Sequence, residues 1–377
     1  MCMNKTKIAI NLLSFETAAL TGVGYFFKRL FESLPPLPNT EFIIFCQRRF
    51  DLKQIIHIPE ALNVTCINAP NFSSKIARIA YEQLILPYKC RQFHILYSPC
   101  AANPLIKINT QLITTIHDLT PFFVPYKYGH LQGWYVRCIT KLLAKRSDKI
   151  ITVSNNSKED LIRIVGIQSS RIHIVYNFIP QIERRAISYQ PFFLCVGTRQ
   201  PGKNLSAVIR SFAIFCNRYD TEQHRLVIVG GDGWGNTDYI NLISELKIKD
   251  RIDLLGYIEE SKLNYLYATC KGNILLSLYE GFGIPILEAL SWHKPSVASH
   301  NSSLSEVMGA TGISVDPNNF EEVALAIKAI AADPQKYLIG MDDQLKRFSS
   351  EKQVAAFIQA LGLNSSFYEG AAKFRPA

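Results

Sequence analysis

The chain has 377 residues, a formal net charge of +10 at pH 7 and 48% hydrophobic residues. At about 150 residues per domain, this length predicts two or three domains, each with a core of its own. No apolar run approaches the roughly 20 residues of a transmembrane helix, while the charge of +10 leaves nucleic acid, anionic lipid and anionic substrates open as partners.

The N-terminal stretch and the cysteines indicate a cytoplasmic protein. Residues 8–13 are apolar, but this run is too short for a signal-peptide core and lacks a small-residue cleavage site. The nine cysteines are widely spaced without a Cys-x-x-Cys motif, and several, such as Cys46 and Cys195, lie inside apolar stretches. We therefore expect reduced core cysteines, and neither a disulfide framework nor a metal site.

The first half of the chain alternates short apolar segments with helical ones, as a doubly wound parallel sheet does. Strands are expected at 7–13, 42–46, 64–67, 93–98, 111–116, 149–154 and 171–177. Helices are expected at 76–86, ending at Pro87, and at 134–145. The periodicity is lost around residue 183, which predicts one domain at 1–183 and a second at 184–377, with terminal helices at 321–331 and 352–361.

Two polar features of this half follow predicted strands. Gly22 and Gly24 form a Gly-x-Gly turn that opens a helix, where backbone amides can meet a diphosphate, although an ordinary tight turn explains the pattern equally well. His117, followed by Asp118, ends the strand at 111–116, and ligands of open parallel sheets bind beyond such strand ends. A polar strand end with a local turn is the alternative for His117.

The second half restarts the alternating pattern. A buried strand at 191–197 is followed by a turn that carries Arg199 and Lys203, two cations suited to a diphosphate, although most charged turns are simply solvated. A further strand at 225–229 ends at Gly230, where the backbone can approach a ligand closely or merely turn. A strand at 252–258 contains Tyr257 and Ile258.

The stretch 274–290 carries the most specific pattern. Apolar residues 274–276 predict a buried strand, Glu280 and two glycines form a turn, and Pro285 suits the first turn of a helix that contains Glu288. Helix N-termini attract phosphate, and carboxylates accept hydrogen bonds from sugar hydroxyls. A site that combines backbone amides for a phosphate with carboxylates for hydroxyl groups suits a nucleotide sugar. The alternative is an ordinary strand-to-helix turn with two solvated acids.

Glu280 and Glu288, separated by seven residues that include Gly-Phe-Gly-Ile-Pro, resemble the signature of a large family of retaining glycosyltransferases with the GT-B fold. The resemblance is close over most of the second half; in the first it rests on Gly22–Gly24 and on His117-Asp118. It implies an α/β protein of two Rossmann-like doubly wound domains that face each other across a cleft. The N-terminal domain would bind the acceptor and the C-terminal domain the nucleotide sugar, and a terminal helix would pack back on the first domain.

The resemblance also implies roles for individual residues. Residues 197–204 match a Gly-x-x-x-Pro-x-Lys-Asn element of the family, and this match implies that Lys203 binds the leaving diphosphate. Arg199 is a weaker candidate for the second cation, because relatives carry their arginine where this chain has Gly202 or Thr198. His117 would lie beside the donor sugar. The full expected set is His117, Arg199, Lys203 and Glu280 for catalysis, and Gly22, Gly24, Gly230, Tyr257, Ile258, Gly281, Phe282, Gly283, Ile284 and Glu288 for binding the nucleotide sugar.

The expected reaction needs no cofactor. The chain has no Asp-x-Asp, the motif expected where a divalent ion carries the diphosphate, so metal independence is predicted. His-Asp-Leu-x-Pro resembles family members that use GDP-mannose for cell-surface polysaccharide such as lipopolysaccharide, and a UDP-sugar donor is the alternative. The resemblance implies that the anomeric configuration is retained and that the leaving phosphate acts as the base. From the sequence itself, no carboxylate can be assigned as a nucleophile.

Other classes stay open. A different enzyme of the GT-B fold, such as an epimerase or a phosphorylase, is one alternative. A nucleic-acid-binding protein would account for the charge, yet no basic helix or aromatic–basic repeat supports it. A saccharide or lipid-linked acceptor is expected, and a peripheral position at the inner face of the cytoplasmic membrane fits both such an acceptor and the basic charge.

Overall fold

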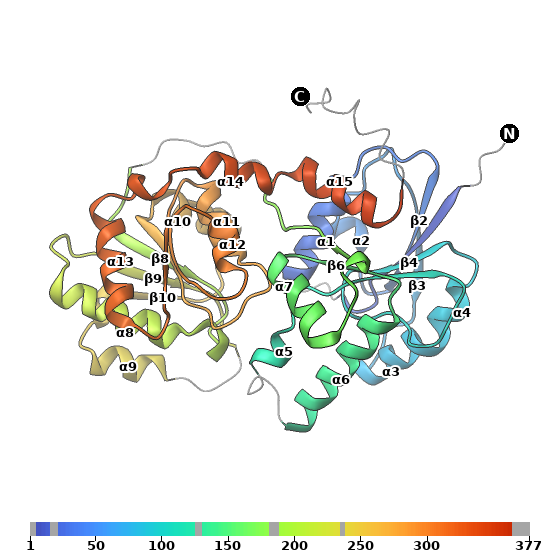
Figure 1. Cartoon of the computed structure of the whole chain (residues 1–377), viewed down its shortest axis with the longest axis horizontal. Coiled ribbons are helices and arrows are strands. Elements are labelled where there is room, and N and C mark those ends of the chain that lie inside the picture. Colours follow the sequence, from blue (N-terminus) through green and yellow to red (C-terminus); the bar gives the residue numbers. More distant parts are fainter. Residues whose placement is uncertain (1–4, 16–21, 125–129, 181–187, 234–237, 364–377) are drawn as a thin grey trace. The chain divides into compact units, whose positions relative to one another are not determined.

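The computed structural model describes residues 5–15, 22–124, 130–180, 188–233 and 238–363. The chain divides into two compact units (Figure 1). Unit 1 comprises Met1–Leu119, Trp134–Phe178 and Ser349–Ala377, and unit 2 comprises Thr120–Gly133 and Ile179–Phe348. The predicted domain boundary between residues 183 and 184 lies outside the described residues.

Unit 1 is built on a seven-stranded sheet in the order β3-β2-β1-β4-β5-β6-β7, with every neighbouring pair parallel. Its strands are β1 (Thr6–Asn11), β2 (Thr40–Gln47), β3 (Asn63–Ala69), β4 (Ile95–Ser98), β5 (Gln111–Thr115), β6 (Lys149–Thr152) and β7 (Ile172–Ile174). The order reverses between β1 and β4, which creates a topological switch point at their carboxyl ends.

Aromatic packing joins α1 (Gly22–Glu32) and α15 (Ser350–Ala360) to this sheet. Phe31 of α1 meets Phe42 of β2 edge-on, and Tyr97 of β4 meets Phe357 of α15 with ring centroids 5.2 Å apart. The C-terminal helix α15 therefore belongs to the core of unit 1, although it follows unit 2 in sequence (Figure 1). The opposite face of the sheet is covered by apolar residues around Leu86 and Cys90.

The prediction that a helix ends at Pro87 is wrong. Helix α3 (Lys75–Ala80) runs into a π-helical turn at Tyr81–Ile85 and continues as α4 (Leu86–Cys90). Pro87 lies in the first turn of α4, where a proline has no intrahelical donor to lose. The π turn separates the two α-helical segments, so the proline does not end the helical path.

Unit 2 contains a six-stranded parallel sheet in the order β10-β9-β8-β11-β12-β13. Its strands are β8 (Phe192–Val196), β9 (Arg225–Val229), β10 (Ile252–Leu255), β11 (Gly272–Leu275), β12 (Ser296–Ser299) and β13 (Ile313–Val315). The order reverses between β8 and β11, so this sheet also has a switch point.

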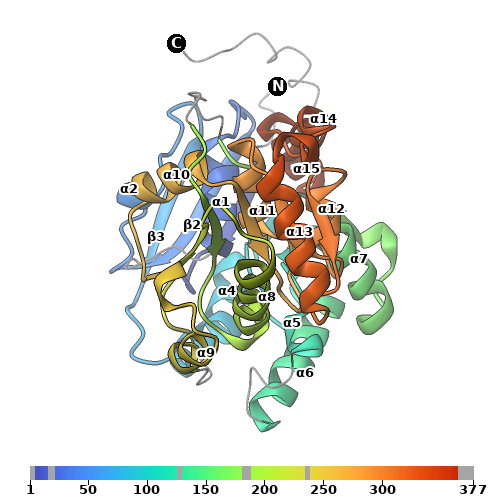
Figure 2. The same ribbon diagram turned by 90° about the vertical axis from the view of Figure 1, so that its left-hand side faces the viewer.

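Both faces of the second sheet are buried, which explains why β8 is apolar at every position. Phe193 packs with α8 (Leu205–Arg218) and α13 (Phe320–Ala332), whereas Leu194 packs on the other face with Tyr267 of α10 (Glu260–Thr269). Figure 2 shows α8 and α13 side by side on one face.

The remaining α-helices are α2 (Leu52–Ile55), α5 (Thr120–Phe123), α6 (His130–Arg146), α7 (Asn155–Asp160), α9 (Tyr239–Glu245), α11 (Ile284–Ser291), α12 (Leu304–Met308) and α14 (Met341–Arg347). None of the described helices combines the length and the apolar character that crossing a bilayer requires.

Candidate functional site

An ion pair lies at the switch point of unit 2. The turn after β8 carries Lys203, and the turn after β11 carries Glu280; the ammonium group of Lys203 donates directly to Oε1 of Glu280. Their side chains are 23% and 16% exposed, so this charged pair is partly shielded from water while still reachable from it. The switch point is where doubly wound sheets bind ligands.

Serine side chains hold the Glu280 turn in place. Ser277 donates to the same carboxylate oxygen at 2.7 Å, and the backbone N–H of Glu280 donates to Ser302 at 3.1 Å. The fully buried hydroxyl of Ser303 donates to the carbonyl of Glu280 at 2.9 Å and to that of Phe282 at 2.8 Å. The carboxylate therefore sits on a pre-ordered turn.

The Lys203 turn is tied to this turn through the backbone. The short 3₁₀ helix Pro201–Lys203 ends at Asn204, and the carbonyl of Gly202 accepts from the N–H of Leu278 at 2.9 Å. The aliphatic part of Lys203 passes over Gly197, where an added Cβ would lie 3.5 Å from its Cε. Both turns consequently present their charges as one unit.

Gly230 lies where the ends of β8 and β9 approach too closely for a side chain. Its φ is +141°, and an added Cβ would lie 2.1 Å from the carbonyl oxygen of Gly197. A larger residue would force these two strand ends apart, and the Lys203 turn begins at one of them. Close packing thus explains why a glycine stands at position 230. Its expected role in binding the nucleotide sugar stays a prediction.

Arg199, the expected second cation, pairs with an acid of its own. Its guanidinium donates from Nε to Asp232 at 2.9 Å and lies 2.7 Å from the same oxygen through a second nitrogen. The carboxylate is 87% exposed, whereas the arginine side chain is only 15% exposed. Arg199 and Lys203 share one loop but hold different carboxylates.

Helix α11 begins directly after the Glu280 turn. Its N-cap is Gly283, whose φ of +108° favours glycine, and no side-chain cap accepts from the first turn. Gly281 and Phe282 are buried just before it, and Ile284 is its first residue. This N-terminus has the geometry that favours phosphate.

Glu288 lies on the second turn of α11 and is held by a buried tyrosine. The hydroxyl of Tyr267, whose residue is 1% exposed, donates to Oε2 of Glu288 at 2.9 Å. Burial, and then the nearby Glu288 carboxylate, raises the pKa of Tyr267 well above its usual value, so the phenol stays a donor. Sequence reasoning missed Tyr267, because a tyrosine inside an amphipathic helix carries no signal of its partner.

The strand end at β10 presents two contrasting residues. Tyr257 is 84% exposed, and Ile258 packs against the apolar cluster beneath α10. An exposed aromatic ring beside a strand end can stack on a base, which suits the expectation for Tyr257 without testing it.

In unit 1, His117 follows β5 and lies beside the switch point of that sheet. Its Nε2 is 2.9 Å from the carbonyl oxygen of Pro99, and its ring meets Phe26 edge-on at 5.1 Å. Burial lowers the pKa of His117, outweighing the Pro99 carbonyl and Asp118, which raise it. The imidazole is therefore neutral at pH 7, with its proton on Nε2 because a carbonyl can only accept.

The glycine turn expected to face a diphosphate is only partly described. Gly22 and Gly24 lie in the first turn of α1, Gly22 exposed and Gly24 buried, whereas the preceding residues 16–21 lie outside the described residues. His117, Gly22 and Gly24 belong to unit 1, and the other expected site residues all belong to unit 2.

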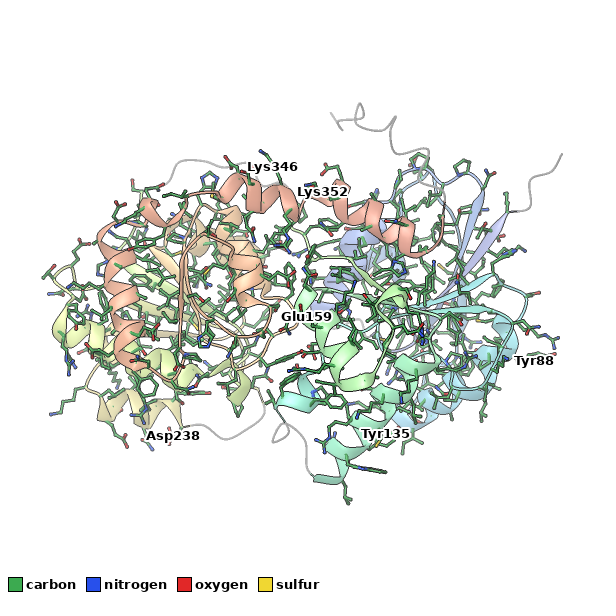
Figure 3. All side chains as sticks on the ribbon, viewed as in Figure 1. Tyr88, Tyr135, Glu159, Asp238, Lys346 and Lys352 are labelled. Atoms are coloured by element: carbon green, nitrogen blue, oxygen red, sulfur yellow. The ribbon has the colours of Figure 1, made fainter. Side chains whose placement is uncertain are left out.

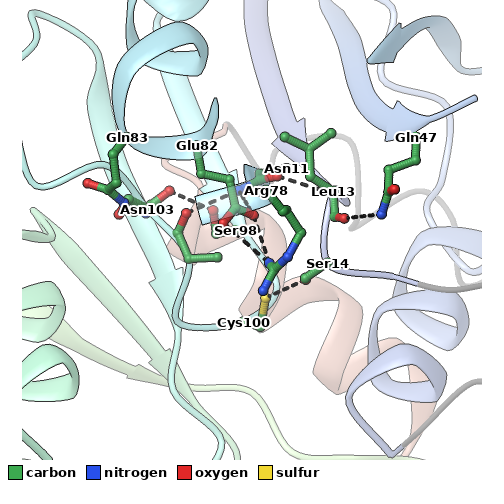
Figure 4. A network of polar contacts seen from close by, with 11 residues as sticks. Asn11, Leu13, Ser14, Gln47, Arg78, Glu82, Gln83, Ser98, Cys100 and Asn103 are labelled. Atoms are coloured by element: carbon green, nitrogen blue, oxygen red, sulfur yellow. Dashed lines mark hydrogen bonds and ion pairs between the residues drawn. The ribbon is translucent and has the colours of Figure 1, made fainter. Parts of the chain in front are cut away.

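A second polar cluster lies at the switch point of unit 1 (Figure 4). Asn11 ends β1 and donates to the buried Glu82 of the π turn at 3.4 Å, and Arg78 donates to the same carboxylate at 3.1 Å. Ser14 and Cys100, which follow β1 and β4, are in contact at 3.1 Å. Sequence reasoning did not single out any of these residues.

Within the described ranges, no group of three or more His, Cys, Asp or Glu side chains is arranged to hold a metal ion. The switch point of unit 2 offers a cation for phosphate, two carboxylates for hydroxyls and an uncapped helix N-terminus.

Two family models match adjacent parts of the chain. The model described as Glycosyl transferases group 1 matches residues 181–353, and the model described as Glycosyltransferase Family 4 matches residues 27–181. The first match contains Lys203, Glu280 and Glu288, and the second contains His117.

Curated relatives include enzymes of O-antigen synthesis. The O-antigen chain mannosyltransferase RfbU of Salmonella typhimurium is 27% identical over 261 residues, 67% of this chain and 67% of its own length. The O-antigen chain mannosyltransferase B of Escherichia coli is 30% identical over 232 residues, 57% of this chain and 60% of its own length. The similarity thus spans about two thirds or less of each relative.

Solved structures match the chain over almost its whole length. The lipopolysaccharide outer core galactosyltransferase WaaB aligns with a TM-score of 0.68 at 18% identity, covering 95% of this chain and 99% of that one. The sucrose-phosphate synthase of Thermosynechococcus elongatus aligns with a TM-score of 0.75 at 17% identity, covering 95% and 98%. Together with the two Rossmann-like sheets, this likeness confirms the predicted GT-B fold class.

Proposed function

The chain belongs to the group 1 glycosyltransferases, and from this membership we propose that it transfers a hexose from a nucleotide-sugar donor to a saccharide or lipid-linked saccharide in cell-surface polysaccharide synthesis. The observation that carries the proposal is the Lys203–Glu280 pair at the switch point of unit 2, next to the uncapped N-terminus of α11. This combination is suited to a sugar diphosphate.

The proposed roles follow from the chemistry of each side chain. Lys203, with Arg199 as a second cation, stabilises the charge that develops on the leaving diphosphate, a contribution that is commonly large in catalysis. Glu288 accepts from the ribose hydroxyls, and Glu280 with the amides of residues 281–284 holds the sugar and the diphosphate. His117, neutral at pH 7, lies beside the donor sugar in this proposal.

Transfer with retention of the anomeric configuration completes the proposed mechanism. The leaving phosphate oxygen takes the proton of the acceptor hydroxyl on the same face of the sugar, so no enzyme carboxylate forms a covalent bond. Lys203 offsets the negative charge throughout, and no divalent ion is required. Trapping a covalent glycosyl–enzyme intermediate would contradict this mechanism.

We propose GDP-mannose as the donor, because the two relatives described above are named mannosyltransferases. A UDP-sugar is the second candidate, since another relative, from Campylobacter jejuni, is named an N-acetylgalactosaminyltransferase. Release of GDP or UDP from a panel of GDP- and UDP-sugars in the presence of lipid extract as the acceptor source distinguishes them. Turnover of UDP-sugars alone would refute the mannose assignment.

The alternative activities for this fold are isomerisation of the nucleotide sugar and phosphorolysis. Observing either reaction without a saccharide acceptor would argue against glycosyl transfer. The same panel tests this alternative, because an epimerase converts its nucleotide sugar without releasing the nucleotide. Release of nucleotide that depends on added acceptor is the result expected for a transferase.

A further inference from the structure

Exposed hydrophobic side chains are concentrated on one part of unit 1. Nine of the eighteen large hydrophobic side chains that are exposed among the described residues come from α3–α4, from the loop at residues 103–108 and from residues 134–146, the part of α6 that belongs to unit 1. They are Ile76, Ile79, Leu84, Ile85, Tyr88, Ile106, Trp134, Tyr135 and Leu142. A soluble surface rarely gathers so many, and such patches mark contact sites.

These elements form a continuous surface, because the loop joins the two helical stretches. Gln83 of the π turn donates to the carbonyl of Asn103 at 3.2 Å and accepts from the N–H of Leu105 at 2.8 Å. From the other side, Arg146 at the end of α6 donates to the carbonyls of Leu105 at 3.2 Å and of Ile106 at 3.1 Å.

The charge of this surface is of one sign. Residues 75–107 and 130–146 contain nine lysines and arginines and a single acid, Glu82, which is buried against Arg78. On α6 the cations Arg137, Lys141 and Lys145 recur every four residues, beside Tyr135 and Leu142. These segments therefore carry a large part of the chain's net charge of +10.

Aromatic rings stand at both ends of the surface. Tyr88 on α4 is 64% exposed and is covered by the guanidinium of Arg91, 4.1 Å from the ring centroid. Trp134 and Tyr135 on α6 are 63% and 50% exposed. Figure 3 shows Tyr88 and Tyr135 at the outer margin of unit 1. Tyrosine and tryptophan favour the headgroup level of a bilayer, and lysine and arginine reach the phosphates around them.

We propose that this surface, defined by α3–α4, the 103–108 loop and α6, docks unit 1 on an anionic lipid bilayer. Apolar side chains with cations and no exposed acid match the requirements of an interfacial helix, which combines buried apolar area with attraction to anionic headgroups. A second copy of the chain would bring the same positive charge to the interface, which disfavours self-association there. The proposal deepens the proposed function, since it brings the enzyme to lipid-linked acceptors.

Co-sedimentation with vesicles tests the proposal. Full-length protein is mixed with vesicles of phosphatidylcholine alone or with 30% phosphatidylglycerol, at about 0.05 M and 0.5 M NaCl. We expect at least tenfold tighter binding to the anionic vesicles, weakened at high salt, because each basic residue near the surface adds attraction that salt screens. Equal binding to both vesicles, or none, would overturn the proposal.

Variants separate this surface from the net charge. The double variants K89E/K145E and Y88S/W134S each remove two exposed groups and should weaken binding at least tenfold. Matched double controls in unit 2, K249E/K262E and I240S/L325S, change two exposed lysines and two exposed hydrophobic residues and should bind as the wild type does. Equal losses in the controls would refute a defined docking surface.

Two further measurements distinguish the failure of this proposal from other failures. Concentration-dependent self-association that the Y88S/W134S variant abolishes, without vesicle binding by the wild type, would assign the surface to a second copy instead. Nucleotide release from the donor panel in detergent depends on unit 2 chemistry and not on this surface. Vesicle binding without any such turnover would leave the docking surface standing while the proposed function fails.

Discussion

Lys203 and Glu280 are opposite charges that hold each other before any ligand arrives. Their contact fixes the position of the Lys203 side chain after β8, and it also pairs the ammonium group with a carboxylate. A diphosphate brings more negative charge than Glu280 and would draw the ammonium toward itself, which leaves Glu280 able to accept from sugar hydroxyls. The pair therefore acts as a preorganised site rather than as a source of stability.

Replacing Lys203 tests this idea. Lys203→Ala should lower kcat/KM for the donor at least about 100-fold, because one missing stabilising group on a developing charge commonly costs that much. The far-ultraviolet circular dichroism spectrum should be unchanged. Arg199→Ala is the matched comparison: a loss of similar size identifies Arg199 as the second cation, and unchanged kinetics restrict it to its pair with Asp232. Full activity of Lys203→Ala would remove Lys203 from the site.

Tyr267 is a positioning residue for Glu288 in this proposal. Tyr267→Phe removes one hydrogen bond to the carboxylate and should raise KM for the donor by about fivefold, since such a bond contributes on the order of 1 kcal/mol. The turnover number kcat should change less than KM, because the ribose does not react. Tyr265→Phe, which loses only an exposed contact with Gln190, is the control and should leave both constants unchanged.

At the scale of elements, the end of β5 carries a histidine whose burial makes stability depend on pH. Because the pKa of His117 is lowered in the folded state, the unfolded chain binds this proton more readily. The stability that neutral His117 supports is present above pH 6.5 and is lost as the pH falls through that value and below it.

His117→Gln, which keeps an N–H for the Pro99 carbonyl but cannot be protonated, should reduce this loss. Urea unfolding at pH 7.5 and 5.5 measures it, and the wild type should lose up to about 1.4 kcal/mol more than the variant between these values. The exposed His57→Gln serves as the control. An identical pH dependence in wild type and His117→Gln would show that folding does not change the pKa of His117 and would contradict this prediction.

The π turn carries a buried carboxylate that depends on one cation. Glu82 has a side chain only 3% exposed, and Arg78 lies on the preceding helix. Burial raises the pKa of Glu82, although Arg78 and the hydrogen bond from Asn11 lower it. Arg78→Leu should cost about 3–5 kcal/mol of unfolding free energy at neutral pH, because the remaining charge is buried without a cation to balance it.

The sign of the pH effect gives this prediction a second readout. An acid whose pKa is raised on folding favours the protonated form, and protonated Glu82 needs no cation, so the deficit of Arg78→Leu should shrink at pH 5. The exposed pair of Lys346 and Asp343 supplies the control, and Lys346→Ala should cost no more than about 1 kcal/mol. A deficit independent of pH would indicate lost packing instead of an unpaired charge.

At the scale of the whole molecule, the sequence predicted the fold because its strongest signals are local. Most strands contain an apolar run, and several of the turns that follow them carry glycine, proline or a charge, so the alternation of strands and helices and the doubly wound class could be predicted. Glu280, Gly283 and Pro285 occupy consecutive parts of one strand–turn–helix unit, and the structure has that unit as expected.

Long-range contacts were beyond the reach of these patterns. No local pattern around Arg199 predicts its contact with Asp232, 33 residues away. The sequence around Tyr267 likewise does not predict its hydrogen bond to Glu288. The π turn before Pro87 was missed because a proline in an apolar run normally signals the end of a helix. The return of α15 to unit 1 was expected from family resemblance alone, and its basis is the aromatic contact of Tyr97 with Phe357.

The division of the molecule into two units with separate cores makes the location of the nucleotide testable. If the switch point of unit 2 binds the diphosphate, GDP at 100 times its Kd should stabilise that unit by about 2.7 kcal/mol. Hydrogen exchange should slow at residues 197–203 and 277–290, while β1–β3 of unit 1 exchange at unchanged rates. Lys203→Ala should abolish the protection at the same GDP concentration. Protection confined to the carboxyl ends of β1 and β4 would place the nucleotide in unit 1 and refute the assignment of Lys203, Glu280 and Glu288.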